Sequence, residues 1–207
     1  MQKIYTVILA AGTSSRLGFN KLTVKIDGRP VIARAIEPFC REAIEKIFIV
    51  TNPEASSVRR EIEKHFSFSL SNFTFIENSH YRDGMSSSVM AALPFIEDAD
   101  AVFFHLGDKP FIKRETISSM LDIYMRDGVP ILIPEYKKKK GHPVLVKIKP
   151  YFEEMKGLTG DKGLREIIDK HGEDVVFIRG DEGSVFDIDT VETVNLLKER
   201  GHRIEKS

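Results

Sequence analysis

Cysteine and net charge are the two quantities that this sequence has least of. Cys40 is the single cysteine among 207 residues, so no internal disulfide can form, and a reducing compartment suits the chain. Lysine and arginine together number 31, and so do aspartate and glutamate, which gives a formal net charge of zero. Proteins that bind nucleic acid over a broad surface are typically basic, so we expect no nucleic-acid partner. From the cysteine content we expect a cytoplasmic protein.

Long apolar runs are missing as well. The apolar stretch 4–11 is too short for a secretory signal and continues directly into Gly12 and a polar loop. No run approaches the ~20 residues that a membrane-spanning helix needs, so no membrane association is expected. Hydrophobic residues still make up 42% of the chain, which is typical of a folded globular protein and untypical of a disordered one.

Several well-known motifs do not occur either. The sequence has no GxxxxGK[ST] phosphate loop, no GxGxxG dinucleotide motif and no GxSxG turn of the α/β-hydrolases. No metal-site spacing links His65, His80, His105, His171 and His202. His105 falls in a predicted strand, where we expect a core group with satisfied hydrogen bonds. Cys40 lies in a stretch with helical spacing, where a buried and unreactive thiol is expected.

Apolar strands alternate with amphipathic helices along the chain. Strands are predicted at 4–9, 46–51, 73–77, 101–106, 130–134, 143–147 and 175–179, with a short extended piece at 186–188. Helices are predicted at 31–39, 54–66, 86–96, 115–126, 164–170 and 191–199. This order indicates βαβ units, and hence a single-domain, three-layer α/β/α fold with a Rossmann-like, mostly parallel (mixed) sheet. The least regular stretch, 134–163, is interpreted as an excursion of the same domain that faces a substrate.

The loop after the first strand has the composition of an anion-binding loop. Sheets of this kind bind ligands beyond the carboxyl ends of their strands. Ala10, Ala11 and Gly12 are small, so backbone N–H groups can approach a ligand closely. Arg16 and Lys21 add cations that suit phosphate oxygens. The alternative is an ordinary turn that carries two surface cations.

Carboxylates follow two other predicted extended segments. Asp108 comes directly after the strand 101–106, where it could bind Mg²⁺, an ion that takes one or two carboxylates together with substrate phosphates. Asp187 and Asp189 would point to the same side of an extended segment, so one of them could complete the metal site. The alternatives are a plain turn at Asp108 and a helix N-cap at Asp189 or Thr190.

Three further stretches admit more than one interpretation. Residues 84–88 place three serine hydroxyls at the start of a predicted helix, where one can cap the helix or several can bind a base or a ribose. His142, between Gly141 and Pro143, is either a substrate contact or a loop histidine with no role. The run Lys137 to Lys140 is either a solvated loop or a site that attracts a phosphorylated second substrate.

Taken together, these stretches resemble the molybdenum cofactor cytidylyltransferase family, the MocA-like branch of the nucleotidyltransferases, which is related to the MobA-like molybdopterin guanylyltransferases. LAAGTSSRLGFNK, which begins at Leu9, is similar to the family's LAAGxSxRMGxxK, and GMSSSV is similar to its GMSSSL. LGDKP, GHPVLV, GDKGLREII and DIDTVE are similar to its LGDQP, GHPVLF, GDxGxRxxL and DIDTPED. The matches follow the family order and extend from residue 9 to residue 192, and the set is far more specific than any one motif.

The resemblance implies the fold of the nucleotide-diphospho-sugar transferases, with a nucleotide-binding half at about 1–110 and an acceptor-binding half at about 111–207. It implies that Arg16, Lys21 and Asp108 are catalytic and that Asp108 and Asp189 hold Mg²⁺. The nucleotide would contact Leu9, Ala10, Ala11, Gly12, Thr13, Ser14, Arg16, Lys21, Gly84, Ser86, Ser87, Ser88 and Asp108. The acceptor would contact Lys109, His142, Asp161 and Arg165.

The activity implied is the transfer of CMP from the nucleoside triphosphate CTP onto a phosphorylated acceptor, molybdopterin, with release of pyrophosphate and delivery of the product to a molybdoenzyme. Ala11 favours cytidine, because the guanylyl relatives usually carry LAGG. Lys109 stands where the family usually has Gln, which leaves the acceptor open. The alternatives are a sugar phosphate, methylerythritol phosphate or phosphorylated alcohol as acceptor, and a carrier that binds the nucleotide form of the cofactor without turnover.

Overall fold

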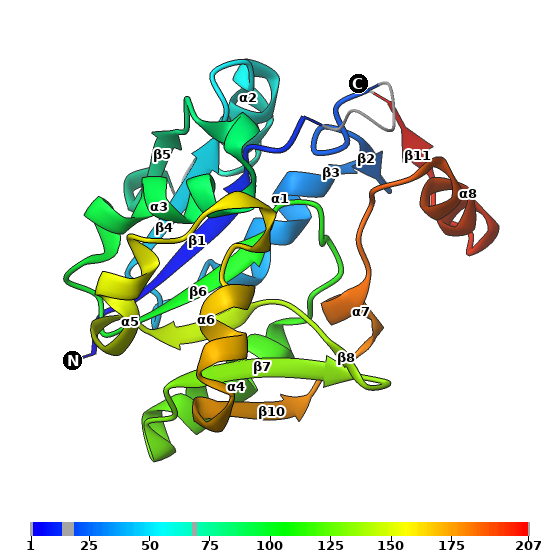
Figure 1. Cartoon of the computed structure of the whole chain (residues 1–207). Helices are drawn as coiled ribbons and strands as arrows, with labels where there is room; N and C mark the ends of the chain where they lie inside the picture. The colour runs from blue at the N-terminus through cyan, green and yellow to red at the C-terminus, as the bar shows by residue number, and fades with distance from the viewer. Residues whose placement is uncertain (1, 14–18, 68–69, 207) are drawn as a thin grey trace.

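The computed structural model of the chain describes residues 2–13, 19–67 and 70–206. One mixed sheet forms its centre (Figure 1). In spatial order its strands are β10 (Val175–Arg179), β7 (Ile131–Tyr136), β9 (Val144–Lys147), β6 (Ala101–Leu106), β1 (Ile4–Ala10), β4 (Lys46–Thr51) and β5 (Phe73–Glu77), and β8 (Lys139–Lys140) pairs with β7. Only β9 is antiparallel to both of its neighbours on this path, so the predicted mostly parallel, mixed sheet is confirmed.

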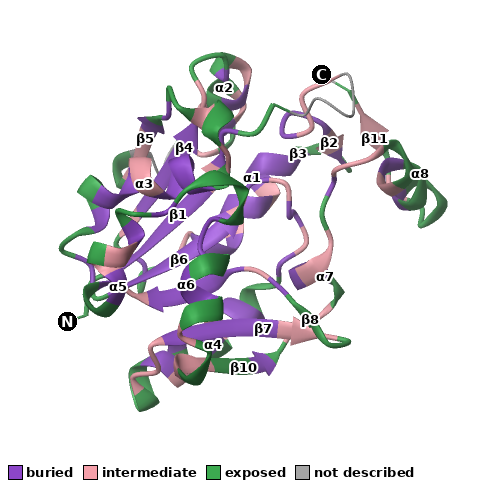
Figure 2. Ribbon diagram, viewed as in Figure 1, coloured by how far each residue is buried: buried purple, intermediate pink, exposed green. Residues whose placement is uncertain are grey.

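Helices cover both faces of the sheet. One face packs against α1 (Val31–Ile36), α2 (Ser56–His65) and α4 (Arg114–Asp127), and the other packs against α3 (Met85–Ile96), α5 (Ile148–Met155) and α6 (Arg165–Lys170). Strand β1 contributes side chains to the cores on both faces of the sheet. Ile4 and Ile8 pack on the face of α1, and Tyr5 and Val7 pack on the face of α3. The buried centre of the sheet is visible in Figure 2. The predicted single-domain, three-layer fold is therefore confirmed.

The remaining elements are short, apart from one helix near the C-terminus. Within the described residues, 3-10 turns lie at Glu37–Phe39, Leu70–Asn72, Tyr81–Asp83, Gly160–Lys162 and Gly172–Asp174. The short helix α7 (Glu182–Val185) precedes α8 (Val191–Glu199), and β2 (Lys25–Ile26), β3 (Arg29–Pro30) and β11 (Ile204–Glu205) form a second, small sheet. Within the described ranges, no helix is both long and apolar enough to cross a bilayer.

The stretch predicted to be irregular, 134–163, is more ordered than expected. It contains the β7–β8 hairpin, β9 and α5. Helix α5 was not predicted because Pro150 discourages a helical interpretation, yet proline is tolerated in a first turn. Its buried Ile148, Tyr151 and Met155 do have helical spacing. The predicted helix 31–39 ends sooner than expected, since a 3-10 turn that contains Pro38 replaces its last three residues.

The interpretation of Cys40 needs a small correction. This residue lies just beyond that 3-10 turn rather than inside an α-helix, and it is half-buried. Burial raises the pKa of the Cys40 thiol to about 11, so the thiol stays protonated at neutral pH. The expectation of an unreactive thiol is consistent with this raised pKa.

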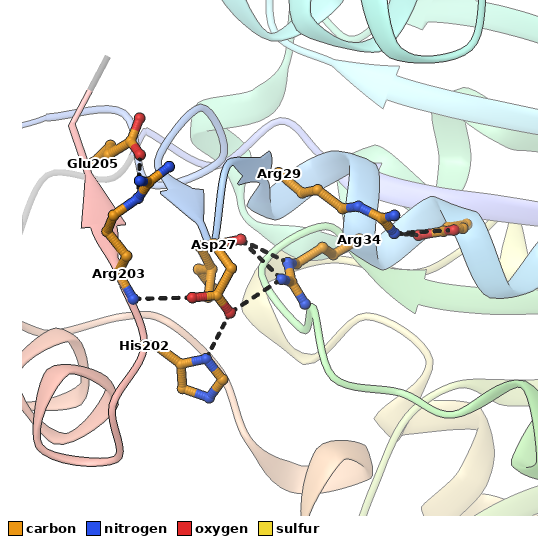
Figure 3. Close-up of polar contacts among 8 residues, drawn as sticks. Asp27, Arg29, Arg34, His202, Arg203 and Glu205 are labelled. Atoms are coloured by element: carbon orange, nitrogen blue, oxygen red, sulfur yellow. Dashed lines mark hydrogen bonds and ion pairs between the residues drawn. The ribbon is translucent and has the colours of Figure 1, made fainter.

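The C-terminal segment is tied to the loop that follows Lys21 (Figure 3). Strand β11 pairs with β2, and the turn residue Asp27 accepts a hydrogen bond from the Arg203 backbone N–H at 2.9 Å. His202 Nδ1 lies 2.8 Å from Asp27 Oδ2, and Arg34 Nη2 lies 3.4 Å from the same oxygen. These contacts join residues 25–34, which follow Lys21, to residues 202–205, which follow α8.

Gly84 permits the closest approach between α3 and the 3-10 turn at 160–162. Its φ is +98°, a conformation that side chains disfavour, and an added Cβ would lie 2.5 Å from the Gly160 carbonyl carbon and 2.6 Å from Asp161 Oδ1. Ser86 supports the contact, because its Oγ donates to Thr159 O at 3.0 Å and accepts from Gly163 N–H at 3.1 Å. A residue without a side chain is therefore required at position 84.

We predict that Gly84→Ala destabilises the fold by roughly 2 kcal/mol or more, because it adds both backbone strain and a clash. Chemical denaturation followed by circular dichroism measures the change. Gly172→Ala is the matched control, since nothing lies within 4 Å of a Cβ added there. Equal losses in the two variants would contradict this account of Gly84.

Candidate active site

The candidate site lies at the carboxyl ends of β1 and β6. The two strands are parallel neighbours, with Leu9 opposite Leu106, so the loop after β1 and the turn after β6 emerge side by side. The Gly107 backbone N–H donates to the Leu9 carbonyl at 2.9 Å. A Cβ on Gly107 would lie 2.9 Å from Ile32 Cδ1, so this turn packs closely against α1. Asp108 is thereby brought beside the small residues of the first loop.

A cavity of about 520 Å³ opens at this point. Many residues predicted to bind the nucleotide or the metal line it: Leu9, Ala10, Ala11, Gly12, Thr13, Lys21, Gly84, Ser88, Asp108 and Asp189. Ser14 and Arg16, which were also predicted, lie outside the described residues. The structure thus brings together the first loop, the turn after β6 and the segment before α8 in one cavity.

Lys21 lies between two carboxylates in this cavity. Its Nζ is 2.5 Å from Asp108 Oδ2 and 2.8 Å from Asp189 Oδ1, and both aspartates are partly shielded from solvent. Burial alone would lower the pKa of Lys21, but the attraction of Asp108 and Asp189 outweighs burial and the pKa is raised. The Lys21 ammonium is therefore charged at neutral pH, and both carboxylates lie within reach of a single cation.

The two candidate metal ligands near the C-terminus are in different surroundings. Asp189 faces Lys21, whereas Asp187 lies 3.4 Å from Lys109 Nζ and lines a second cavity. The N-cap of α8 is Thr190, whose side chain accepts from Thr193 N–H, so the capping alternative holds for Thr190 and not for Asp189. Segment 186–189 is not a strand, and Asp187 and Asp189 line different cavities, so the expectation that they point to the same side is wrong.

The serines at the start of α3 make contacts within the chain. The N-cap of α3 is Gly84 without a side-chain hydrogen bond, so the expectation that a serine caps this helix is wrong. Ser87 Oγ donates to the Gly84 carbonyl at 2.7 Å, and Asn78 Nδ2 donates to Ser87 Oγ at 2.9 Å and to Ser88 Oγ at 3.0 Å. Ser88 lines the first cavity, while Ser86 holds the 159–163 segment.

The second cavity, also about 520 Å³, adjoins the first and shares four lining residues with it, Leu9, Met85, Leu106 and Asp161. All four residues predicted to contact the acceptor line it: Lys109, His142, Asp161 and Arg165. Asp108 lines the first cavity and Lys109 the second, so these consecutive residues mark the boundary. We call the two spaces the Asp108 cavity and the Lys109 cavity.

Comparison with known proteins agrees with this arrangement. A family profile described as the MobA-like NTP transferase domain matches residues 6–175. The chain belongs to this family. It is also 34% identical over 121 residues to the 2-C-methyl-D-erythritol 4-phosphate cytidylyltransferase of Clostridium perfringens, an alignment that covers 56% of this chain and 52% of that protein. The chain thus matches about half the length of this curated relative.

Solved structures of the same fold cover nearly the whole MobA-like chain. Rv0371c from Mycobacterium tuberculosis superposes with a TM-score of 0.78 at 23% identity, covering 96% of this chain and 98% of that one. A complex of that protein with manganese gives a TM-score of 0.75 at 22% identity, covering 96% of this chain and 99% of that one. At these identities the likeness establishes the fold.

Two neutral histidines lie beneath the Lys109 cavity. Burial, and then the nearby charge of Lys109, lower the pKa of His142 to about 4. Burial, and then the neighbouring His142, lower the pKa of His105 to about 3. His105 Nε2 contacts Lys109 O at 3.1 Å, but the Nδ1 atoms of both rings are buried without a partner in the part of the chain that is described. The prediction of a fully satisfied His105 is therefore wrong.

Some residues around the site were not predicted. Asn52, just after β4, donates from Nδ2 to the Ala11 carbonyl at 3.0 Å and so braces the first loop. Asn78, just after β5, fixes the serines of α3. Both asparagines follow strands at the edge where ligands bind, a signal that the sequence did contain. Tyr81 and Arg82 also line the Asp108 cavity, and no motif marked them.

We predict that Lys21→Met increases the affinity for divalent metal in the absence of nucleotide by at least about tenfold. The change removes the ammonium group that lies on Asp108 and Asp189, and leaves two neighbouring carboxylates without that cation. Mn²⁺ binding followed by electron paramagnetic resonance measures the effect. Lys198→Met on the exposed side of α8 is the control. Unchanged Mn²⁺ affinity in Lys21→Met would show that Lys21 does not compete with a metal.

Proposed function

We propose that the chain is a metal-dependent nucleotidyltransferase that moves CMP from CTP onto a phosphorylated acceptor, with molybdopterin as the favoured acceptor. The observation that carries the proposal is the contact between two cavities of similar size at Asp108 and Lys109. One cavity has a loop of small residues and three carboxylates, of which Asp108 and Asp189 converge on Lys21, and the other has an excess of cations. A transferase that joins two anionic substrates needs adjoining sites of this kind.

The Asp108 cavity fits a divalent cation such as Mg²⁺. Asp108 Oδ1 is buried and lacks a hydrogen-bond partner within the described ranges, so a ligand is needed to satisfy it. Asp108 Oδ2 and Asp189 Oδ1 already converge on one cation, the Lys21 ammonium. No group of three acidic, histidine or cysteine ligands occurs in the described chain, which suits an ion that takes its other ligands from phosphates. When bound, Mg²⁺ would neutralise negative charge at the α-phosphate.

The residues of the chain would carry the reaction by position and charge. Backbone groups of Ala10 to Thr13 would surround the triphosphate, and Lys21, displaced from the carboxylates, would pair with the departing pyrophosphate. Arg16 is proposed for the same role, although it lies outside the described residues. Lys109 would hold the acceptor phosphate, whose oxygen forms a bond to the α-phosphorus as the bond to pyrophosphate breaks. An acceptor phosphate ionised at neutral pH needs no general base.

The identities of the nucleotide and the acceptor rest on different observations. Ala11 and the cytidylyltransferase name of the Clostridium perfringens relative support CTP. The motif resemblance supports molybdopterin and subsequent delivery to a molybdoenzyme, whereas the same relative supports methylerythritol phosphate as a second candidate acceptor. A carrier without turnover is less consistent with Asp108 and Asp189, because binding alone does not need two converging carboxylates.

We expect pyrophosphate release only when CTP and molybdopterin are both present. The measurement uses each of the four nucleoside triphosphates with molybdopterin, with methylerythritol phosphate, with a sugar phosphate and without an acceptor. Release of pyrophosphate with methylerythritol phosphate and not with molybdopterin would make methylerythritol phosphate the acceptor. Tight binding of the cytidine dinucleotide of the cofactor without any release would favour the carrier.

We expect Asp108→Asn to reduce pyrophosphate release by at least about a hundredfold, because the variant loses a negative charge that holds the metal. Asp189→Asn is expected to raise the Mg²⁺ concentration needed for half-maximal rate. Asp187→Asn is the control, since Asp187 faces Lys109 and not Lys21. A shift in Mg²⁺ dependence with Asp187→Asn alone would transfer the second metal ligand from Asp189 to Asp187.

A further inference from the structure

The β7–β8 hairpin carries four successive lysines, Lys137 to Lys140, beside the Lys109 cavity, and two of them line it. Glu135 pairs with Lys140 and Tyr136 with Lys139, so Lys137 and Lys138 form a two-residue turn. These two turn residues have φ values of 49° and 64°, a region where turns normally use glycine or asparagine. The run is exposed, as expected of a solvated loop, but it is ordered as a strained hairpin, and strain of this kind often accompanies a binding role.

The end of the hairpin is held firmly in place. Gly141 N–H donates to the Pro134 carbonyl at 2.7 Å, and His142 N–H donates to the Ser184 carbonyl at 2.8 Å. A Cβ on Gly141 would lie 2.8 Å from the Ser184 carbonyl oxygen, so α7 and the hairpin are in close contact. Lys139 and Lys140 line the cavity, whereas Lys137 and Lys138 do not.

The charge of the Lys109 cavity exceeds what one phosphate requires. Among the described residues that line it, five are cationic and two are acidic: Lys109, Lys139, Lys140, Lys162 and Arg165 against Asp161 and Asp187. Lys109 has Asp187 at 3.4 Å. Lys140 has a long contact of 3.6 Å to the exposed Asp169 and lies 5.8 Å from the centre of the Phe177 ring, and exposed contacts of this kind contribute little. The hairpin end of the cavity therefore keeps positive charge that a ligand can use.

An apolar floor separates the two charged ends. Phe104, Val144 and Ile133 come from the adjacent strands β6, β9 and β7, all three line the cavity, and all three are buried in the same core. Phe104 is directly opposite Val144 in the β6–β9 pairing. Since β9 lies between β6 and β7, the hairpin is roughly 10 Å across the sheet from the end of β6 at two strand spacings. A flat, weakly polar body fits between the two ends.

We propose that the acceptor carries, besides the phosphate that reacts, a second anionic group at its opposite end, which Lys139 and Lys140 bind. This inference rests on the proposed function only in taking the ligand of the Lys109 cavity to be the acceptor. The substrate class is a phosphomonoester with a flat ring body and a distal anion. Lys139 and Lys140 thereby favour a phosphomonoester with a distal anion over one whose distal end is neutral. The distal ends of molybdopterin and methylerythritol phosphate are neutral, so confirmation of this inference would replace both as the acceptor.

The test compares two rigid probes, 4-carboxyphenyl phosphate and 4-carbamoylphenyl phosphate, which have nearly the same shape and differ in one charge. Binding to the full chain is measured by calorimetry at one fixed ionic strength. We expect the carboxylate to bind about tenfold more tightly, as one charge-assisted contact provides. In the double variant Lys139→Gln, Lys140→Gln this ratio is expected to fall to about one, with the affinity for the carbamoyl probe unchanged within about twofold.

The double variant Lys137→Gln, Lys138→Gln is the matched control, because it removes the same charge from the same hairpin at positions that do not line the cavity. It should keep the tenfold ratio. Equal affinities for the two probes in the unaltered chain, equal loss of the ratio in both double variants, or no binding of either probe at millimolar concentration would each overturn the inference. If the chain discriminates between the probes but releases no pyrophosphate in the assay with the nucleoside triphosphates and acceptors, the proposed function is wrong and this inference stands.

Discussion

The pairing of β1 with β4 on one side and β6 on the other is the constraint on which the candidate site depends. Every position from Tyr5 to Leu9 has a partner in both neighbours, so the end of this strand is fixed in the middle of the sheet. The chain must then leave the sheet through the loop after Ala10, directly beside the turn that carries Asp108. Small residues in that loop matter because they allow backbone N–H groups to approach a ligand closely.

Charge is arranged around this edge as two groups of lysine and aspartate side chains, one on each side of the boundary between the cavities. Lys21 lies on Asp108 and Asp189 in the first cavity, and Lys109 lies near Asp187 in the second. Buried or half-buried charges need partners, so each lysine compensates the nearby carboxylates while no substrate is bound. The same lysines are cations that substrate phosphates can take over. In the folded chain the two lysines neutralise aspartates, and in the proposed reaction they would neutralise substrate phosphates.

The C-terminal segment contributes through its attachment rather than through a motif. β11 pairs with β2, Asp27 contacts His202 and Arg203, and Ile188 N–H donates to the Asp108 carbonyl at 3.0 Å. The segment that carries Asp189 is thus attached at two points along the chain. Ile188, before it, is bonded to the turn after β6, and β11, beyond α8, belongs to the small sheet. A carboxylate on an otherwise unpaired segment is positioned in this way beside a loop that lies 168 residues earlier in the chain.

The sequence by itself determined the strands and most helices, because apolar spacing is a local property, and it placed small residues and Asp108 at strand ends. The MobA-like family also follows from ordered motifs in the sequence. Only the tertiary structure decided that Asp187 and Asp189 line different cavities, that Lys139 and Lys140 belong to a hairpin over the second cavity, and that His142 is neutral. These features depend on contacts between distant segments and on burial, and neither quantity is encoded in the spacing of neighbouring residues.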